Sequence, residues 1–160
     1  GICGGYQMLG ERIDDPDHVE GSTESIPGIG LLPVDTVLEK NKTTEQCTFQ
    51  FNGNAEKCRG YEIHMGKTIS NGTSSPLNTL DNNKEDGYYL NKYCWGTYIH
   101  GILDNKVVID SLLEDLTDKK AESRSYQDFK EEQYNKLAEH LREYLDLSCL
   151  IGNQHLNSHS

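Results

Sequence analysis

The stretch GICGGYQMLG, from Gly1 to Gly10, decides how the rest of the sequence is interpreted. It places Cys3 between small residues and follows this cysteine with a run that is compatible with a helix. The pattern is typical of a sharp turn from a strand into a helix, where one side chain projects at the bend. Glycines tolerate the strained backbone of such a turn and leave room for a ligand to approach. The sequence therefore predicts a projecting, reactive side chain at Cys3.

The position of Cys3 ahead of a helix suggests a chemical role for its sulfur. The positive end of a helix dipole favours the thiolate, which is the reactive form of cysteine. The backbone N–H of Gly4 would point toward the oxygen of a carbonyl that Cys3 attacks, as one half of an oxyanion hole. The alternative is a small buried residue, which is the usual role of a lone cysteine in a glycine-rich turn.

The composition argues against several classes of function. The sequence has 160 residues and a net charge of −11 at pH 7, which disfavours a nucleic-acid-binding surface and docking on anionic lipid. Its apolar runs are too short to cross a bilayer. An odd number of cysteines without a CxxC pair disfavours a disulfide framework or a zinc site, so we expect no metal and a reducing, cytoplasmic location. The cysteines are Cys3, Cys47, Cys58, Cys94 and Cys149.

The sequence has no initiator methionine and begins inside the predicted turn, without the strand that should precede Cys3. We therefore expect a fragment of a longer protein. Residues 1–150 would be the C-terminal part of one domain, and residues 151–160 would form a flexible tail.

Hydrophobic periodicity predicts a mixture of strands and helices. Alternating apolar residues predict strands at 29–38, 47–51, 60–69, 88–90 and 93–99. Polar segments predict loops or turns at 14–25, 41–45, 52–54 and 70–86. Apolar residues at spacings of three and four predict helices at 7–12, from 104 to 116 with Asp104 as N-cap, and at 134–145.

Three stretches could meet in such a fold: the turn at Cys3, YEIHMG around His64, and GTYIHGIL around His100. Active sites of α/β sheets gather at strand ends and sharp turns. His100 ends a predicted strand and precedes a glycine, so it could project toward Cys3 and act as its base, although a lone histidine in this position is more often structural. Glu62 and His64 share a strand face, where they could line the cleft, contact substrate or orient His100. The alternative for this pair is a structural hydrogen bond.

The sequence GICGGYQ is similar to the GxCxGxQ elbow of class I (triad-family) glutamine amidotransferases. GYEIHMG at 60–66, WGTYIHGIL at 95–103 and EEQYNKLAEHLREYLDL near the C-terminus resemble the cobyric acid synthase group of that family. The resemblance runs from Gly1 to about Leu150. It implies an α/β, flavodoxin-like domain with a mixed central sheet that is incomplete at its N-terminus.

The resemblance also implies a chemistry. Cys3 attacks the side-chain amide of glutamine, Gly4 helps to hold the oxyanion, and ammonia leaves with a proton from His100. Gln7 matches the motif glutamine that helps to hold the substrate. The ammonia would pass to a synthetase domain, absent from this sequence, that uses ATP and Mg to amidate carboxylates of the corrinoid cobyrinic acid a,c-diamide. Glu62 and His64 could then also seal the ammonia route. No cofactor is expected in this chain itself.

One position departs from the usual family pattern. The triad places Glu two residues after the histidine, and Ile102 stands there in this sequence, as in cobyric acid synthases. We therefore expect a Cys–His dyad with slow glutaminase turnover. Two alternatives remain open: a relative with another acceptor, such as a,c-diamide synthase or a lipid-linked cell-wall precursor amidotransferase, and an inactive docking module.

Overall fold

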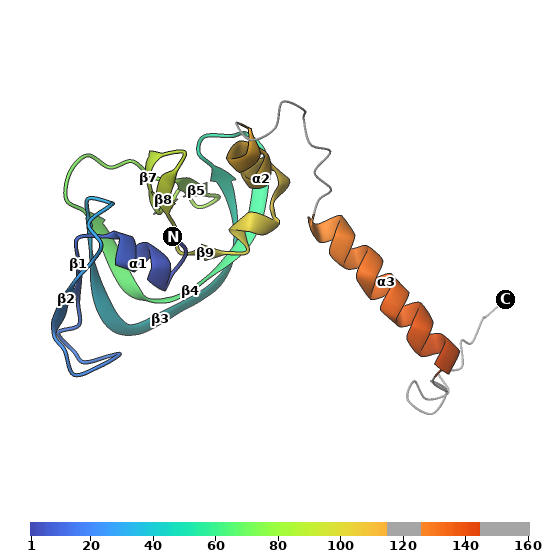
Figure 1. The fold of residues 1–160 in the computed structure, drawn as a ribbon, viewed down its shortest axis with the longest axis horizontal. Helices are drawn as coiled ribbons and strands as arrows, with labels where there is room; N and C mark the ends of the chain where they lie inside the picture. Colours follow the sequence, from blue (N-terminus) through green and yellow to red (C-terminus); the bar gives the residue numbers. More distant parts are fainter. Residues whose placement is uncertain (115–125, 145–160) are drawn as a thin grey trace. The chain divides into compact units, whose positions relative to one another are not determined.

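The structure is a computed structural model that describes residues 1–114 and 126–144 (Figure 1). The chain divides into two compact units, Gly1–Ser123 and Arg124–Ser160, and each is described by itself. The first unit contains the sheets, two α-helices and every residue of the candidate site. The second unit contains helix α3 (Tyr126–Tyr144).

Within residues 1–114, the strands form a seven-stranded mixed sheet and a separate hairpin. The main sheet has the order β2-β1-β3-β4-β9, with β5 paired to β3 and β6 paired to β5. Its strands are β1 (Arg12–Asp14), β2 (Ser25–Pro27), β3 (Val34–Phe51), β4 (Lys57–Ser70), β5 (Asn78–Leu80), β6 (Glu85–Asp86) and β9 (Ile99–His100). The hairpin joins β7 (Tyr88–Asn91) to β8 (Cys94–Gly96), and the helices are α1 (Gly4–Leu9), the 3₁₀ turn η1 (Ile102–Asp104) and α2 (Lys106–Leu113).

The pairing of these strands confirms the predicted α/β class with a mixed central sheet. Strand β1 runs parallel to β3, whereas β3 with β4 and β4 with β9 are antiparallel. An isolated parallel bridge also joins Ile2 to Thr97. Residues just before Cys3 therefore lie beside the segment that leads to His100.

The β3–β4 hairpin dominates the first unit. Figure 1 shows the two strands side by side, curving around α1. Asn52 and Gly53 have φ values of 44° and 72°, which Asn and Gly tolerate best, so the predicted turn at 52–54 is confirmed. On β4 the buried side carries Glu62 and Gly66, whereas Tyr61 and Ile69 are exposed. Usually the apolar side chains of a strand are buried and the charged ones are exposed. The reversal here indicates that the buried polar side chains of β4 have hydrogen-bond or ionic partners.

Two groups of buried side chains form the core. Members of both groups come from segments with alternating apolar residues, as expected for half-buried strands. One group contains Phe49, Phe51, Cys58, Leu77, Leu80, Ile99, Ile102 and Val108, and the other contains Tyr6, Leu32, Val34, Tyr88 and Tyr98. The second group attaches α1 to the segment before His100, because the ring of Tyr6 packs edge-on to Tyr98 with centroids 5.3 Å apart.

The first predicted elements need two corrections. The helix expected at 7–12 ends at Leu9, because the next residues form backbone hydrogen bonds to β3, and Arg12 begins β1. The strand expected at 29–38 begins only at Val34. The residues before it instead bond to the end of α1, with the N–H of Leu31 2.9 Å from the carbonyl oxygen of Leu9.

Three later expectations are also wrong. The turn expected at 41–45 is a register shift inside the continuous strand β3, between Leu38 and Thr43. The loop expected at 70–86 contains β5 and β6, because Leu77 and Leu80 are buried there. Asp104 lies in η1 and does not cap α2. Asn105 precedes that helix, and its side-chain amide donates to the carbonyls of residues 59, 101 and 102.

The strand expected at 93–99 is divided into β8 and β9, with a short connection between them. Helix α3 includes most of the helix expected at 134–145, but it begins at Tyr126. The expectations for residues 115–125 and for everything after residue 144, including the tail, lie outside the described residues. None of the described helices is long and apolar enough to cross a bilayer.

Candidate active site

Cys3 adopts an uncommon backbone conformation at the start of α1. Its φ is 53° and its ψ is −120°, a combination that costs about 1–3 kcal/mol in a residue with a side chain. Neighbouring hydrogen bonds hold this conformation. The N–H of Cys3 donates to the carbonyl of Thr97 at 2.8 Å, and the carbonyl of Cys3 accepts from Tyr6 at 2.8 Å and from Gln7 at 3.1 Å. The predicted sharp turn into a helix is therefore present.

The helix side of Cys3 is open. A Cβ atom built on Gly4 or on Gly5 would meet nothing within 4 Å, and both residues are exposed. Gly4 is the first residue of α1, so its N–H has no partner within the helix, and it has none elsewhere in the described part of the chain. This leaves a free backbone donor and free space next to the sulfur, which are what an oxyanion site requires.

His100 is the last residue of β9, which pairs with β4. His100 pairs with Tyr61 across β9 and β4, and the two rings stack with centroids 5.1 Å apart. Its Nε2 is buried and has no hydrogen-bond partner among the described residues. Buried ring nitrogens are rarely left unpaired in folded proteins, so this atom is available for a proton or a ligand.

Both predicted reactive groups contact strand β4, at residues two positions apart. The thiol of Cys3 lies 3.6 Å from the carbonyl oxygen of Ile63, and the ring of His100 covers Tyr61, two positions earlier on β4. The close approach of β9 requires Gly60, because a Cβ there would lie 2.4 Å from Ile99 and 2.6 Å from the carbonyl oxygen of His100. The first glycine of GYEIHMG is thus explained by packing.

Ile102 explains why no carboxylate follows His100. Its side chain is 0% exposed and lies in the core cluster with Ile99 and Val108. A glutamate there would place a charge among apolar side chains, at a high cost in free energy. The described residues therefore offer no carboxylate at the usual third position of the triad.

Gln7 lies on α1 next to the second glycine of that motif. Its Nε2 donates to the hydroxyl of Tyr98 at 3.3 Å. A Cβ on Gly66 would lie 2.6 Å from the same nitrogen, so only glycine leaves room for this amide. The hydroxyl of Tyr98 also lies 2.6 Å from Oγ1 of Thr68. Burial is the main cause that raises the pKa of Tyr98, so its phenol stays protonated near neutral pH.

Glu62 and His64 form one charged group with Lys84. Glu62 is 1% exposed, and its two carboxylate oxygens lie 2.8 and 3.0 Å from Nζ of Lys84. Nε2 of His64 lies 3.4 Å from Glu62, its Nδ1 lies 2.8 Å from the carbonyl oxygen of Gly66, and its ring stacks on Tyr98 at 3.8 Å. The hydrogen bond from His64, followed by the contact with Lys84, holds the pKa of Glu62 below its ordinary value.

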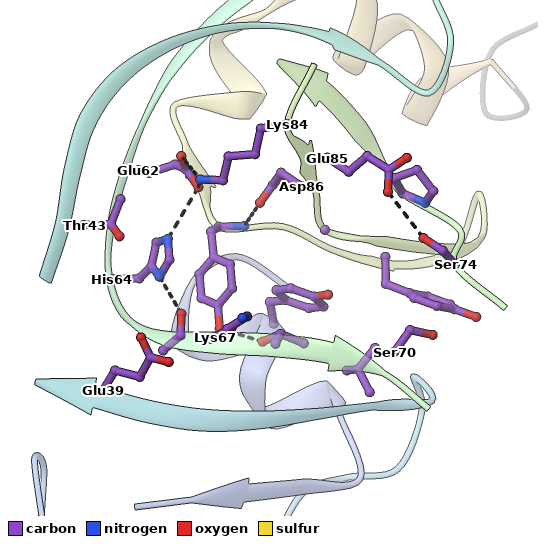
Figure 2. Close-up of a pocket in the computed structure, with 18 residues that line it drawn as sticks. Glu39, Thr43, Glu62, His64, Lys67, Ser70, Ser74, Lys84, Glu85 and Asp86 are labelled. Atoms are coloured by element: carbon purple, nitrogen blue, oxygen red, sulfur yellow. Dashed lines mark hydrogen bonds and ion pairs between the residues drawn. The ribbon is translucent and has the colours of Figure 1, made fainter. Parts of the chain in front are cut away.

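These residues line a cavity of about 450 Å³ on the inner side of β4, shown in Figure 2. Glu62 and His64 point into it from β4, and Lys84 reaches Glu62 from the turn between β5 and β6. Cys3 and His100 do not line this cavity. Since no described hydrogen bond joins Glu62 or His64 to His100, their contacts favour lining the cavity over orienting His100.

A second buried carboxylate holds the segment between β8 and β9. Asp86 accepts hydrogen bonds from the hydroxyl of Thr97, from the side-chain amide of Asn78 at 2.9 Å and from the N–H of Tyr98 at 3.0 Å. Burial raises the pKa of Asp86, and these hydrogen bonds oppose that rise. The carbonyl of Thr97 accepts a hydrogen bond from the N–H of Cys3, so Asp86 supports the turn at Cys3 through Thr97.

Sequence reasoning missed Tyr98, Lys84 and Asp86. Tyr98 lies inside a motif that was noted only for its histidine, whereas the other two lie in a segment that was expected to be a loop. Within residues 1–114 and 126–144, no group of three His, Cys, Asp or Glu side chains is arranged to hold a metal ion. The four cysteines in those ranges are free thiols.

Comparison with known proteins identifies a family for the chain. Residues 1–108 match the CobB/CobQ-like glutamine amidotransferase domain. The chain belongs to this family. The mixed sheet of this amidotransferase domain agrees with the flavodoxin-like fold that the resemblance implied, and the matched range includes Cys3, Gln7, Glu62 and His100.

Three similar proteins carry the same name. The amidotransferase domain is 53% identical to a cobyric acid synthase of Bacteroides fragilis, covering 94% of this chain and 31% of that protein. It is 49% identical to a cobyric acid synthase of Parabacteroides distasonis, covering 95% of this chain and 32% of that protein. A cobyric acid synthase of Syntrophobacter fumaroxidans is 40% identical over 92% of this chain and 33% of its own length. The chain thus spans only a minor part of the relatives that it matches.

Proposed function

We propose that this domain hydrolyses glutamine and supplies ammonia for the amidation of a corrinoid in cobalamin biosynthesis. The observation that carries the proposal is the placement of two reactive groups against β4: the thiol of Cys3 at Ile63 and the ring of His100 at Tyr61. The family match to a glutamine amidotransferase domain and the name of the relatives, cobyric acid synthase, support the substrate and the pathway.

In the proposed reaction, the sulfur of Cys3 attacks the side-chain amide carbon of glutamine as a thiolate. The carbonyl oxygen becomes an oxyanion, and the free N–H of Gly4 stabilises it. His100 gives a proton to the leaving nitrogen, so the C–N bond breaks, ammonia departs and a glutamyl thioester remains on Cys3. Water then attacks the thioester, His100 takes a proton from the water, and glutamate is released.

The acceptor half of the reaction rests on the relatives alone. A synthetase domain would use ATP and Mg to activate carboxylates of cobyrinic acid a,c-diamide, which the ammonia then amidates. We place the reaction in the cytoplasm, because the described cysteines are free thiols and the nucleophile must stay reduced.

The experiment is covalent labelling with a diazo-ketone analogue of glutamine, in which the thiolate attacks the analogue and nitrogen gas leaves. The full-length protein is treated, digested and analysed by mass spectrometry. We expect the adduct on Cys3 and none in Cys3→Ala, while Cys47→Ala labels normally, because burial raises the pKa of Cys47 to about 11 and keeps that thiol unreactive. Failure to label Cys3 would favour the inactive docking module.

A further inference from the structure

A chain of hydrogen bonds connects the middle of the sheet to the helix of the elbow. It runs from Oγ1 of Thr36 to Oγ1 of Thr68 at 2.7 Å, to the hydroxyl of Tyr98 at 2.6 Å, and to Nε2 of Gln7 at 3.3 Å. Thr36 is fully buried on β3, so the chain starts at a rigid point. It ends on an amide four residues after Cys3.

The phenol of Tyr98 is held by ring contacts as well as at its oxygen. The ring of His64 stacks on one side with centroids 3.8 Å apart, and Tyr6 packs edge-on at 5.3 Å. The backbone N–H of Tyr98 is fixed by Asp86 at 3.0 Å. A side chain constrained in this way offers its oxygen in one place, which is the requirement for orienting a neighbour.

The direction of the hydrogen bonds determines what Gln7 offers to a ligand. An amide nitrogen only donates, so the oxygen of Tyr98 is the acceptor, and the phenol hydrogen remains for Thr68. The Oε1 atom of Gln7 makes no hydrogen bond within the described residues, so it remains as a free acceptor. Gly66 keeps this orientation available, because a Cβ there would collide with the nitrogen.

We infer that Tyr98 is a positioning residue for substrate binding, which fixes the amide of Gln7 so that its oxygen accepts an N–H group of the bound amino acid amide. This inference rests on the proposed function, in which Gln7 helps to hold glutamine. It adds the residue that decides which end of the Gln7 amide faces the substrate. The hydroxyl of Tyr98 acts through Gln7 and does not touch the substrate itself.

The test measures glutamine affinity by titration calorimetry on the full-length protein. All variants carry Cys3→Ala, so that bound glutamine is not consumed. Tyr98→Phe removes one oxygen and keeps the ring stack, and we expect the Kd to rise about 5-fold to 10-fold, as for the loss of one hydrogen bond. The control is Tyr88→Phe, because Tyr88 lines the same cavity as Tyr98, but among the described residues its hydroxyl bonds to the carbonyl of Thr73 and not to Gln7. Its Kd should not change.

A double variant of Gln7 and Tyr98 distinguishes a positioning role of Tyr98 from a purely structural one. In a background of Gln7→Ala, Tyr98→Phe should have no further effect on the Kd, because its hydroxyl acts through the amide that is now absent. If the double variant shows the product of the two separate increases in Kd, the inference is overturned. An unchanged Kd in Tyr98→Phe also overturns it. Gly66→Ala keeps the hydroxyl of Tyr98, but its Cβ would lie 2.6 Å from Nε2 of Gln7 and 3.3 Å from that hydroxyl, so it should displace the same amide and weaken binding similarly. Gly72→Ala, where a Cβ meets nothing within 4 Å, should not weaken binding.

These measurements also distinguish this inference from the proposed function. If glutamine binds and the variants behave as described, but Cys3 neither labels nor releases ammonia, the proposed function fails and the role of Tyr98 remains. If Cys3 labels normally and Tyr98→Phe binds glutamine like the parent, only the role of Tyr98 fails. If Tyr98→Phe does not fold, as judged by thermal unfolding, Gly66→Ala decides alone: an unchanged Kd overturns the inference.

Discussion

The backbone N–H of Cys3 donates a 2.8 Å hydrogen bond to the carbonyl of Thr97. This bond ties the start of α1 to the segment that continues, three residues later, to His100. The same segment is anchored from the other side by Asp86. Cys3 and His100 therefore share one support, and a disturbance of that support should affect both.

The strained backbone at Cys3 should affect the free energy of unfolding. At ordinary positions, glycine destabilises a protein by about 0.5–1 kcal/mol relative to alanine, because glycine loses more conformational freedom on folding. At Cys3, with φ at 53°, we expect the opposite order: Cys3→Gly should have a free energy of unfolding about 1 kcal/mol above that of Cys3→Ala. Denaturant titration measures the difference between the two variants, and both lack the sulfur.

The matched position is Gly5, which lies inside α1 with open space around it. There Gly5→Ala should raise the free energy of unfolding by about 0.5–1 kcal/mol, as helix propensity predicts. If Cys3→Gly is instead less stable than Cys3→Ala, the backbone at the elbow is unstrained.

Gly60→Ala should lower both stability and glutaminase activity. The added Cβ would lie 2.6 Å from the carbonyl oxygen of His100, and backbone cannot easily move aside, so β9 must shift. We expect a loss of about 1–3 kcal/mol in unfolding free energy, typical of overpacking, and a fall in kcat. Gly21→Ala is the control, because a Cβ there meets nothing. Unchanged activity in Gly60→Ala would show that the approach of β9 does not matter.

Glu62→Gln should destabilise the domain in a way that depends on pH. Glu62 is buried against Lys84 and His64, so loss of its charge should cost about 1–3 kcal/mol at pH 7. Its pKa lies below its ordinary value in the folded state, so the stabilisation is complete above pH 4.5 and is lost as the pH falls through the lowered value. Urea titrations from pH 7 to pH 3 should show the two proteins converging.

Asp86 is a second titrating group, and its effect has the opposite sign. Burial is the main cause that raises its pKa, so its contribution to stability decreases as the pH rises. The charge of Glu62 adds to that rise, so comparing the variant with the parent cancels only the part that burial causes. Glu39→Gln is the exposed control in the same cavity and should change the unfolding free energy by less than about 0.5 kcal/mol at any pH. A constant difference between Glu62→Gln and the parent down to pH 3 would contradict the assignment.

Thr97→Val tests the shared support. Valine keeps the shape but loses the hydroxyl that donates to Asp86 and accepts from the N–H of Ile99. We expect a loss of about 1–3 kcal/mol in unfolding free energy, because buried polar partners are left unsatisfied. Labelling of Cys3 by the diazo-ketone should also slow, whereas the exposed control Thr79→Val should alter neither quantity. If Thr97→Val is destabilised but Cys3 still labels at the normal rate, the contact between Thr97 and Asp86 does not affect the reactivity of Cys3.

The elbow and the motif histidines could be predicted because local residues determine them. A cysteine before glycines and a helical run specifies its own turn, and alternation on β4 places Glu62 and His64 on one face without further information. The register shift between Leu38 and Thr43 could not be predicted, since polar residues at 41–45 suit a turn as well as a long exposed strand.

The parts of the site that sequence reasoning missed depend on contacts between distant segments. Lys84 pairs with Glu62, 22 positions earlier, from a turn that looks like an ordinary polar loop. Tyr98 contacts Gln7 across 91 positions, and no local pattern distinguishes it from a core tyrosine. Packing alone explains Gly60 and Gly66, but only once the neighbouring strand and helix are placed.

Ammonia release from glutamine by the full-length protein tests the central claim most directly. The account predicts turnover in the parent and in the controls Cys47→Ala and His18→Ala, and a loss of at least about 1,000-fold in both Cys3→Ala and His100→Ala. Undiminished ammonia release from either of these two variants would contradict the claim that the thiol and the imidazole placed against β4 cleave the amide.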